Sequence, residues 1–354
     1  MPSRRVQEDQ SQANLAEARA DLAAARAAGD AARVALLEAL VASGGSLLIY
    51  RPDRGHYGVL LGRLELASHV AVVVPGVGDA TNLRDQWLPS AVHLFEAADS
   101  TSVILWKAYD NPPDLTMAAV ESVGCDTHLT SAAGELTEFV RSLSLRPEQT
   151  LTVVAHSFGS TVTGVALADF GLQCTDVVVA GSPGMTVDAL RQLHLGESHF
   201  FSEQAPGDVI AGLGIFGAEP TSPTFGGTRM RTNGPGFVEV ESHSNYFVPG
   251  SEALENIVDV VTGQYGLVVP QHSSLAETAG GLVAWALRIP MFPVGRVARR
   301  YRGPGFRLLV NAGHLADIGA SQTGNAVSEG IDIGTRVVAW VERQVPGRAT
   351  PPSG

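Results

Sequence analysis

The stretch that most constrains the fold of this chain joins a short apolar segment to a run of small residues through one serine, Ser157. From residue 150 to residue 168 it is TLTVVAHSFGSTVTGVALA. Residues 150–155 predict a buried strand, and the residues from Phe158 onward predict a helix. The pentapeptide Ala155-His-Ser-Phe-Gly159 is therefore typical of a nucleophile elbow, the sharp strand-to-helix turn that presents a serine hydroxyl to solvent.

The residues two before and two after this serine are small. An elbow needs small side chains at both places, because a larger group would collide with the neighbouring strand or with the turn itself. The usual pattern has glycine at both, whereas here Ala155 takes the first and Gly159 the second. A serine at such a turn is also a common helix N-cap, so the motif alone leaves catalysis and capping open.

The composition is that of a core-forming globular protein. With 354 residues, 45% hydrophobic residues and 39 glycines, the chain can form one large α/β domain with appendages but not several ordinary domains. The net charge of -12 argues against a general nucleic-acid binder, because contact with phosphates needs a basic surface. The N-terminus has no positively charged start followed by an apolar core, so we expect a cytoplasmic location, with export by a signal-less route left open.

Metal chemistry is not expected from this sequence. Cys125 and Cys174 are far apart and lack the spacing of zinc ligands, and no cluster of histidine and aspartate has ligand spacing either. We expect two buried free thiols and no cofactor.

Three parts are expected along the chain. Residues 1–45 predict a helical hairpin, because they are dense in Ala, Leu, Glu and Arg and are interrupted at Gly29-Asp30. Residues 46–265 predict the main domain. Residues 266–354 predict a mainly helical extension packed on or beside that domain.

The main domain alternates apolar strands with helices. Strands are expected at 46–50, 59–66, 70–74, 103–106, 150–155, 177–180, 199–203 and 237–240, and helices at 82–97, 132–143, 184–194 and 251–262. Continuous apolar runs are typical of strands covered on both faces in a parallel sheet. The alternation therefore favours a mostly parallel central sheet with helices on both faces, entered by an antiparallel pair. Residues 209–236 show no regular period and predict a long loop near the same sheet edge, such as a lid.

The extension contains an apolar run at 282–287, far shorter than the roughly 20 residues that a membrane span needs. Four arginines follow it, Arg296, Arg299, Arg300 and Arg302, and a last helix is expected at 334–344 before the tail 348–354. An apolar helix followed by arginines can rest on an anionic membrane. We expect instead a helix packed on the domain with a solvated basic end, with weak peripheral membrane contact as the alternative.

A reactive serine needs two partners. An imidazole must take the hydroxyl proton, and a carboxylate must hold that imidazole in the right tautomer. In proteins with a nucleophile elbow they follow in the order serine, acid, histidine, each in a loop after a core strand. Asp208 lies in a Pro-Gly-Asp turn after the strand ending at Glu203, whereas Asp176 precedes its strand and Asp188 lies in a helix. We expect Asp208 to be the acid, although a turn or capping aspartate has the same local sequence.

Four histidines are candidates for the base. His243 follows the expected strand 237–240 and precedes a helix. His156 adjoins the serine, where the elbow directs its ring away from the serine oxygen. His272 and His314 lie outside the repeating sheet pattern, and His314 is the competitor because a late histidine after a glycine fits the order. We expect His243 to be the base.

The oxyanion that forms when a carbonyl is attacked needs two backbone donors. The N–H of Phe158 is one by the geometry of the elbow. The glycine-rich turn 75–78 supplies the second, and Val77 is the expected donor. The glycines on either side of Val77 allow that backbone to approach a substrate closely.

Several motifs together resemble an uncharacterised branch of the α/β-hydrolase superfamily that is common in actinobacteria. They are VPGVG at 74–78, AHSFG at 155–159, the Pro-Gly-Asp208 turn, FGAEPT at 216–221 with FGG at 225–227, and SHSNYF at 242–247 before PGS at 249–251. The resemblance covers about residues 46–265 and implies an α/β-hydrolase fold with a triad of Ser157, Asp208 and His243. It supplies no substrate. The chain departs from the branch at Ala155 and in residues 271–354, which have no counterpart there.

These observations favour a serine hydrolase that cleaves an ester, or less readily an amide or thioester, through an acyl-enzyme. A small-molecule or lipid-like substrate is expected. Two alternatives stay open: a non-catalytic interaction protein that keeps the fold, and an acyltransferase that passes the acyl group to an alcohol.

Overall fold

A computed structural model describes residues 4–110, 125–195, 200–288, 315–316, 318–332 and 335 of the chain. They are organised around an eight-stranded sheet of order β1-β2-β4-β3-β5-β6-β7-β8. The strands are β1 (Ser46–Arg51), β2 (His56–Leu61), β3 (His69–Val74), β4 (Thr101–Lys107), β5 (Thr150–His156), β6 (Asp176–Ala180), β7 (Phe200–Glu203) and β8 (Thr228–Met230). β2 is antiparallel to both β1 and β4, and the other pairs are parallel, which confirms the predicted sheet.

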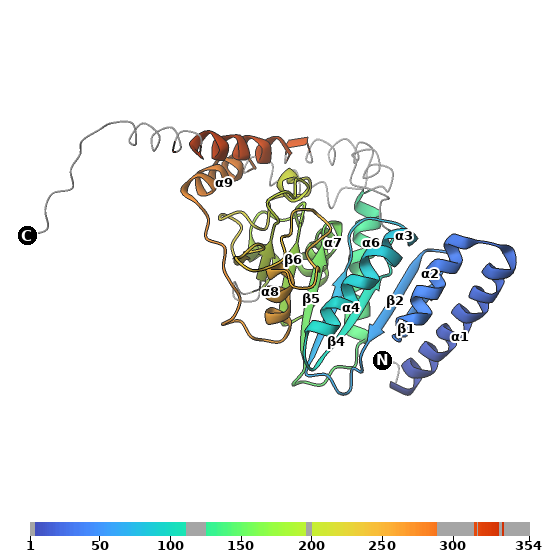
Figure 1. Ribbon diagram of the computed structural model, residues 1–354. Helices are drawn as coiled ribbons and strands as arrows, with labels where there is room; N and C mark the ends of the chain where they lie inside the picture. The colour runs from blue at the N-terminus through green and yellow to red at the C-terminus, as the bar shows by residue number, and fades with distance from the viewer. Residues whose placement is uncertain are drawn as a thin grey trace, which may run out of the picture.

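Helices cover both faces of the sheet (Figure 1). α2 (Ala31–Ala42), α4 (Leu88–Ala97) and α8 (Glu252–Val261) pack on one face, and α6 (Cys125–Ser142) and α7 (Phe158–Phe170) on the other. Successive side chains of a strand point to opposite faces. Val73 of β3 therefore joins the first core while Val72 joins the second, and both are fully buried. Burial on two faces explains the continuous apolar runs of the sequence.

The N-terminal hairpin packs along the β1 edge of the sheet (Figure 1). It consists of α1 (Arg4–Ala28) and α2, as predicted. The side-chain amide of Asn14 in α1 donates to the backbone carbonyl of Leu47 in β1 at 2.8 Å, and Leu40 of α2 is fully buried in the core shared with the sheet. The division of the chain at residue 45 stays a prediction.

The predicted strand 237–240 is wrong, because these residues form no regular structure. Among the residues that the structure describes, the last strand is β8, which lies inside the region predicted as a loop and pairs parallel with β7. With only three residues, β8 is too short for a two-residue period to be recognised in the sequence.

Two predicted helices also differ from the structure. The helix expected over 184–194 is reduced to the 3-10 turn η2 (Leu190–Leu193). The crossover helix expected over 82–97 is divided into α3 (Ala80–Asn82), the π-helical turn η1 (Leu83–Trp87) and α4. A π-turn adds a residue to the helical repeat and re-aims the side chains around it. Here it turns Trp87 into the interior, where it is 3% exposed.

The extension forms a helix pair at the opposite end of the sheet from the hairpin (Figure 1). α9 (Leu275–Arg288) crosses the helical residues 318–332 closely. A methyl group on Gly280 would lie 2.3 Å from the carbonyl oxygen of Gly324, and the Ser328 hydroxyl donates to the carbonyl of Ala276 at 2.9 Å. The helical character of the extension is thus confirmed for its described part.

Several predictions for the extension lie outside the described residues, namely the four arginines, His314, the helix at 334–344 (apart from residue 335) and the tail 348–354. Leu282 of α9 is 52% exposed, and weak membrane contact stays a prediction. Among the helices that the structure describes, none combines the length and apolarity of a membrane span.

Candidate active site

The elbow has the backbone that a nucleophile requires. β5 ends at His156, α7 begins at Phe158, and Ser157 between them has φ 53° and ψ -129°. Such positive-φ strain in a non-glycine residue is uncommon and concentrates at functional sites. Ser157 makes no side-chain capping hydrogen bond to α7. The capping interpretation therefore lacks the hydrogen bond that defines it.

The two small residues of the elbow, Ala155 and Gly159, differ in how much space surrounds them. A methyl group on Gly159 would lie 2.3 Å from the carbonyl oxygen of Val74 and 2.6 Å from that of Pro75, so only glycine fits there. Ala155 lies in β5 between Val74 and Val179 of the neighbouring strands, and its methyl group is fully buried. The departure from glycine at Ala155 therefore leaves the elbow intact.

The structure brings together Ser157, Asp208 and His243. The His243 Nε2 atom lies 2.7 Å from the Ser157 hydroxyl oxygen, and its Nδ1 atom lies 2.9 Å from each oxygen of Asp208. A carboxylate only accepts hydrogen bonds, so Nδ1 carries the proton and Nε2 is free to accept from the serine. The predicted strand before His243 is absent, but the loop in its place still positions the imidazole between Ser157 and Asp208.

The carboxylate of Asp208 is fully buried and well supplied with donors. Its Oδ1 accepts from the backbone N–H groups of Ile210 at 3.0 Å and Ala211 at 3.2 Å, and its Oδ2 accepts from the Tyr246 hydroxyl at 2.6 Å. Burial alone raises the pKa of Asp208, but the hydrogen bonds from His243, Tyr246 and the backbone outweigh it and hold the pKa below its usual value. The acid is therefore ionised at neutral pH.

Tyr246 is a site residue that the sequence analysis did not single out. It is fully buried, and its hydroxyl accepts from the N–H of Ala205 at 2.9 Å while donating to Asp208. Burial and the adjacent carboxylate raise its pKa, so the hydroxyl keeps its proton. Its place three residues after His243, in the motif SHSNYF, is the available signal in the sequence.

His156 contacts the predicted base although it is not itself the base, and the sequence did not indicate this contact. Its Nε2 atom donates to the backbone carbonyl of His243 at 2.5 Å. Its ring centroid lies 4.7 Å from that of His243 and 4.9 Å from that of Trp87. The position of His156 next to Ser157 is the available signal in the sequence. It predicted only that the ring points away from the serine oxygen.

The glycine-rich turn after β3 lies directly against the serine. A methyl group on Gly76 would be 2.7 Å from Ser157 Cβ, and the Tyr109 hydroxyl, which donates to the carbonyl of Pro75 at 2.5 Å, ties the turn to the core. Phe158 is the first residue of α7, and N–H groups in a first helical turn have no intrahelical acceptor. Val77, next to Gly76, is half-buried. The donor roles of Phe158 and Val77 stay predictions.

The remaining candidates are not part of this constellation. His272 lies in the segment before α9, and no hydrogen bond joins it to the three site residues among those described. Cys174 is a half-buried free thiol, and the side chain of Cys125 lies outside the described residues.

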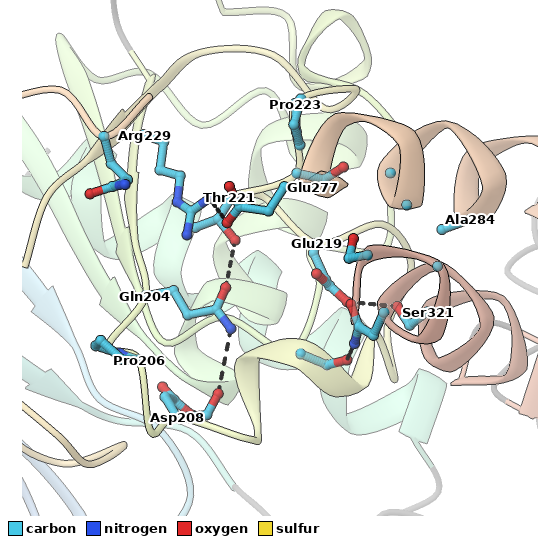
Figure 2. A pocket seen from close by; sticks show the side chains of 18 of the residues that line it. Gln204, Pro206, Asp208, Glu219, Thr221, Pro223, Arg229, Glu277, Ala284 and Ser321 are labelled. Atoms are coloured by element: carbon cyan, nitrogen blue, oxygen red, sulfur yellow. Dashed lines mark hydrogen bonds and ion pairs between the residues drawn. The ribbon is translucent and has the colours of Figure 1, made fainter. Parts of the chain in front are cut away.

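A cavity of about 780 Å³ borders the acid on the side of the extension (Figure 2). Its lining comes from the loops after β7 and β8, from α9 and from residues 318–332. The Gln204 amide donates to the carbonyl of Asp208 at 3.5 Å and accepts from the Thr221 hydroxyl at 2.8 Å. The Ser321 hydroxyl donates to Glu219 at 2.8 Å, and burial raises the pKa of Glu219 to about 6. The extension therefore supplies one wall of a polar pocket beside the acid.

The sheet order, the elbow and the serine, acid, histidine sequence define an α/β hydrolase, and the chain belongs to the α/β-hydrolase family. Residues 52–218 match the family described as Alpha/beta hydrolase. The chain is 30% identical over 211 residues to the uncharacterised protein Rv0963c of Mycobacterium tuberculosis, a match that covers 52% of this chain and 77% of that protein.

A longer relative is matched only in part. The uncharacterised protein Rv2079 of Mycobacterium tuberculosis is 27% identical over 296 residues, which cover 71% of this chain. The chain spans 45% of that relative's length.

Solved structures that resemble this chain include one named as a thioesterase and one named as an esterase. Maize acyl-protein thioesterase 2 is 12% identical, with a TM-score of 0.34 over 59% of this chain and 99% of that one. Esterase LipW from Mycobacterium marinum is 12% identical, with a TM-score of 0.34 over 69% of this chain and 88% of that one.

Proposed function

We propose that this protein is a serine hydrolase that cleaves a carboxylic ester through an acyl-enzyme. Ser157 is the nucleophile, His243 the general base and Asp208 the acid. One observation carries the proposal: His243 Nε2 is 2.7 Å from the serine oxygen while Nδ1 is 2.9 Å from both carboxylate oxygens. Nucleophile, base and orienting acid are thus within hydrogen-bond reach in one line.

The first half-reaction acylates Ser157. As the serine oxygen attacks the ester carbonyl, its proton passes to Nε2 of His243, and the imidazolium that forms is stabilised by ionised Asp208. The oxyanion is placed against the N–H groups of Phe158 and Val77, where removal of one donor typically costs about 2.7 to 4 kcal/mol of barrier. Collapse of the tetrahedral intermediate expels the alcohol, which takes the proton back from Nε2.

The second half-reaction returns the free enzyme. Water gives a proton to Nε2 of His243 and attacks the acyl carbonyl. Collapse of this second tetrahedral intermediate releases the carboxylic acid, and the Ser157 oxygen takes the proton back from Nε2. Apart from the ester and water, these proposed steps use only groups of the chain. An ester is favoured over an amide because an alkoxide leaves more readily than an amide anion, and the proposed substrates are small-molecule or lipid-like esters.

A fluorophosphonate probe tests the nucleophile. We expect the wild-type protein to be labelled and Ser157→Ala to be unlabelled. Ser244→Ala is the matched control, since this serine is exposed and adjoins the base in sequence. Labelling of Ser157→Ala, or no labelling of the wild type, would reject the proposal.

Hydrolysis of p-nitrophenyl esters of increasing chain length tests the reaction and the depth of the acyl pocket together. His243→Ala and Asp208→Asn should each lower kcat by on the order of 10³ to 10⁴. Faster transfer of the acyl group to an added alcohol than to water would assign the acyltransferase alternative instead.

A further inference from the structure

His156 lies at the centre of a buried group of rings beside the proposed base. It is 2% exposed and is the last residue of β5. Its ring centroid is 4.9 Å from that of Trp87, 4.7 Å from that of His243 and 5.8 Å from that of Tyr246. The ring is therefore packed against both the π-turn η1 and the loop that carries the base.

One hydrogen bond of this ring has a fixed direction. The backbone carbonyl of His243 can only accept, so His156 Nε2 must carry a proton. Burial, together with the positive charge of protonated His243, lowers the pKa of His156 to about 3. The ring is neutral at physiological pH, with its single proton on Nε2, and Nδ1 has no hydrogen-bond partner among the described residues.

We propose that His156 is a positioning residue for the general base, which holds the backbone carbonyl of His243 and thereby keeps the imidazole in line between Ser157 and Asp208. The inference rests on the proposed function, because it assigns His156 a part in that same reaction.

His243 needs such a positioning hydrogen bond because it lies in an irregular loop. Its ring must meet the serine at 2.7 Å and the acid at 2.9 Å at the same time, yet residues 236–250 form no helix or strand. A residue in an irregular loop has more conformational freedom than one in a sheet. His156 is the last residue of β5 and directly precedes the nucleophile in the chain. The hydrogen bond to the His243 carbonyl therefore positions the base relative to the serine itself.

A neutral hydrogen-bond donor at position 156 suits the reaction better than a positively charged one. When His243 takes the serine proton it becomes an imidazolium, and a cation packed against it would oppose that step. Because His156 stays neutral, it holds the carbonyl in both protonation states of the base. A lysine or arginine in its place would supply the donor but would also add this repulsion.

Two substitutions separate the hydrogen bond from the bulk of the ring. His156→Gln keeps an amide N–H at nearly the reach of Nε2, whereas His156→Leu keeps an apolar side chain without a donor. We expect His156→Leu to lower both kcat on p-nitrophenyl acetate and the rate of fluorophosphonate labelling about tenfold, with KM changed less than about twofold. The glutamine variant should stay within about threefold of the wild type in both rates.

The Nδ1 proton shared by His243 and Asp208 gives a readout that needs no substrate. Its downfield proton NMR signal should persist in the wild type and in His156→Gln, and should broaden or shift in His156→Leu. Should the leucine variant fail to fold, His156→Asn replaces it, because its amide is one carbon too short to reach the carbonyl.

Two results would overturn the inference while leaving the proposed function in place. One is labelling and turnover of His156→Leu at the wild-type rate. The other is an equal loss in the glutamine and leucine variants with an unchanged NMR signal. A wild-type protein that neither labels nor hydrolyses any ester would instead reject the proposed function.

Discussion

At the scale of single residues, the Asp208 carboxylate accepts hydrogen bonds from more groups than His243. The Tyr246 hydroxyl donates to Asp208 and accepts from the N–H of Ala205 inside a fully buried site. A hydrogen bond between two buried polar groups contributes little net free energy to stability. Removing one of the two partners is costly, because the other is then left buried without a hydrogen bond. Tyr246 thus connects the orientation of the carboxylate to the stability of the loop after β7.

Tyr246→Phe should lower kcat about tenfold and the free energy of unfolding by about 1 to 3 kcal/mol, because the carboxylate loses a donor and the N–H of Ala205 loses its acceptor. Ester hydrolysis and urea unfolding measure the two effects. Tyr265→Phe is the control, since its hydroxyl donates to Asp176, at the opposite end of β6 from the proposed site. Full activity of Tyr246→Phe would mean that the backbone donors alone hold Asp208.

Lys107, the chain's only lysine, is 6% exposed at the end of β4. Its ammonium group donates to the carbonyl of Tyr109 at 3.3 Å. Burial lowers its pKa to about 8, against an opposing effect of Asp110 and Asp79. An unfolded lysine titrates near 10.4, so between pH 8 and about 10.4 the unfolded state binds more protons than the folded state. Stability from this group therefore rises with pH across that window and is lowest below pH 8.

Lys107→Met should raise the free energy of unfolding at pH 7 by up to about 3 kcal/mol, since it removes a buried charge. The advantage should disappear toward pH 10.5. Guanidinium unfolding of both proteins at pH 7 and pH 10 measures the difference, and other titrating groups cancel in the comparison. A variant less stable than the wild type at pH 7 would show that the ammonium group stabilises the fold.

At the scale of elements, predictions succeeded where the pattern is long and local and failed where it is short or interrupted. The apolar run of residues 70–74 predicted β3 well, because burial on both faces leaves a continuous signal. The three residues of β8 carry no such period, and the π-turn η1 differs from an α-helix by a single residue per turn. Both β8 and η1 depend on contacts with residues that are distant in the sequence.

The helix pair of the extension offers a test at this scale. A methyl group on Gly280 would meet the Ser328 hydroxyl at 2.1 Å and the Gly324 carbonyl at 2.3 Å. Gly280→Ala should therefore separate α9 from residues 318–332, destabilise their packing by about 1 to 3 kcal/mol and speed amide hydrogen exchange there. Gly330→Ala is the matched control, because nothing lies within 4 Å of the added methyl group. Equal exchange in the two variants would contradict the close crossing.

At the scale of the whole molecule, the hairpin and the sheet share one core. Leu37 and Leu40 of α2 and Leu47 and Tyr50 of β1 are all 6% exposed or less and belong to a single cluster. Removal of the hairpin would expose this apolar surface together with the β1 edge, which is a template for aggregation.

A chain lacking residues 1–44 should therefore aggregate or unfold at lower temperature, rather than behave as an intact domain without an appendage. Size-exclusion chromatography and thermal unfolding measure this. Arg26→Ala is the control, because it removes only an exposed ion pair with Glu38, and such pairs contribute about 0 to 1 kcal/mol. A soluble truncated protein of unchanged thermal stability would support the division at residue 45.

The fold class, the elbow and the order of serine, acid and histidine could be inferred from the amino-acid sequence, because the strands, the helices and the turns that follow the strands each have a local pattern. The hydrogen bonds among them could not. His243 meets Ser157 across 86 positions and Asp208 across 35, and such contacts exist only once the sheet has brought its strand ends together. The hydrogen bonds of Tyr246 and His156 also depend on the tertiary structure. The sequence around a tyrosine or a histidine does not indicate which buried acceptor its side chain will bind, because that acceptor is set by packing.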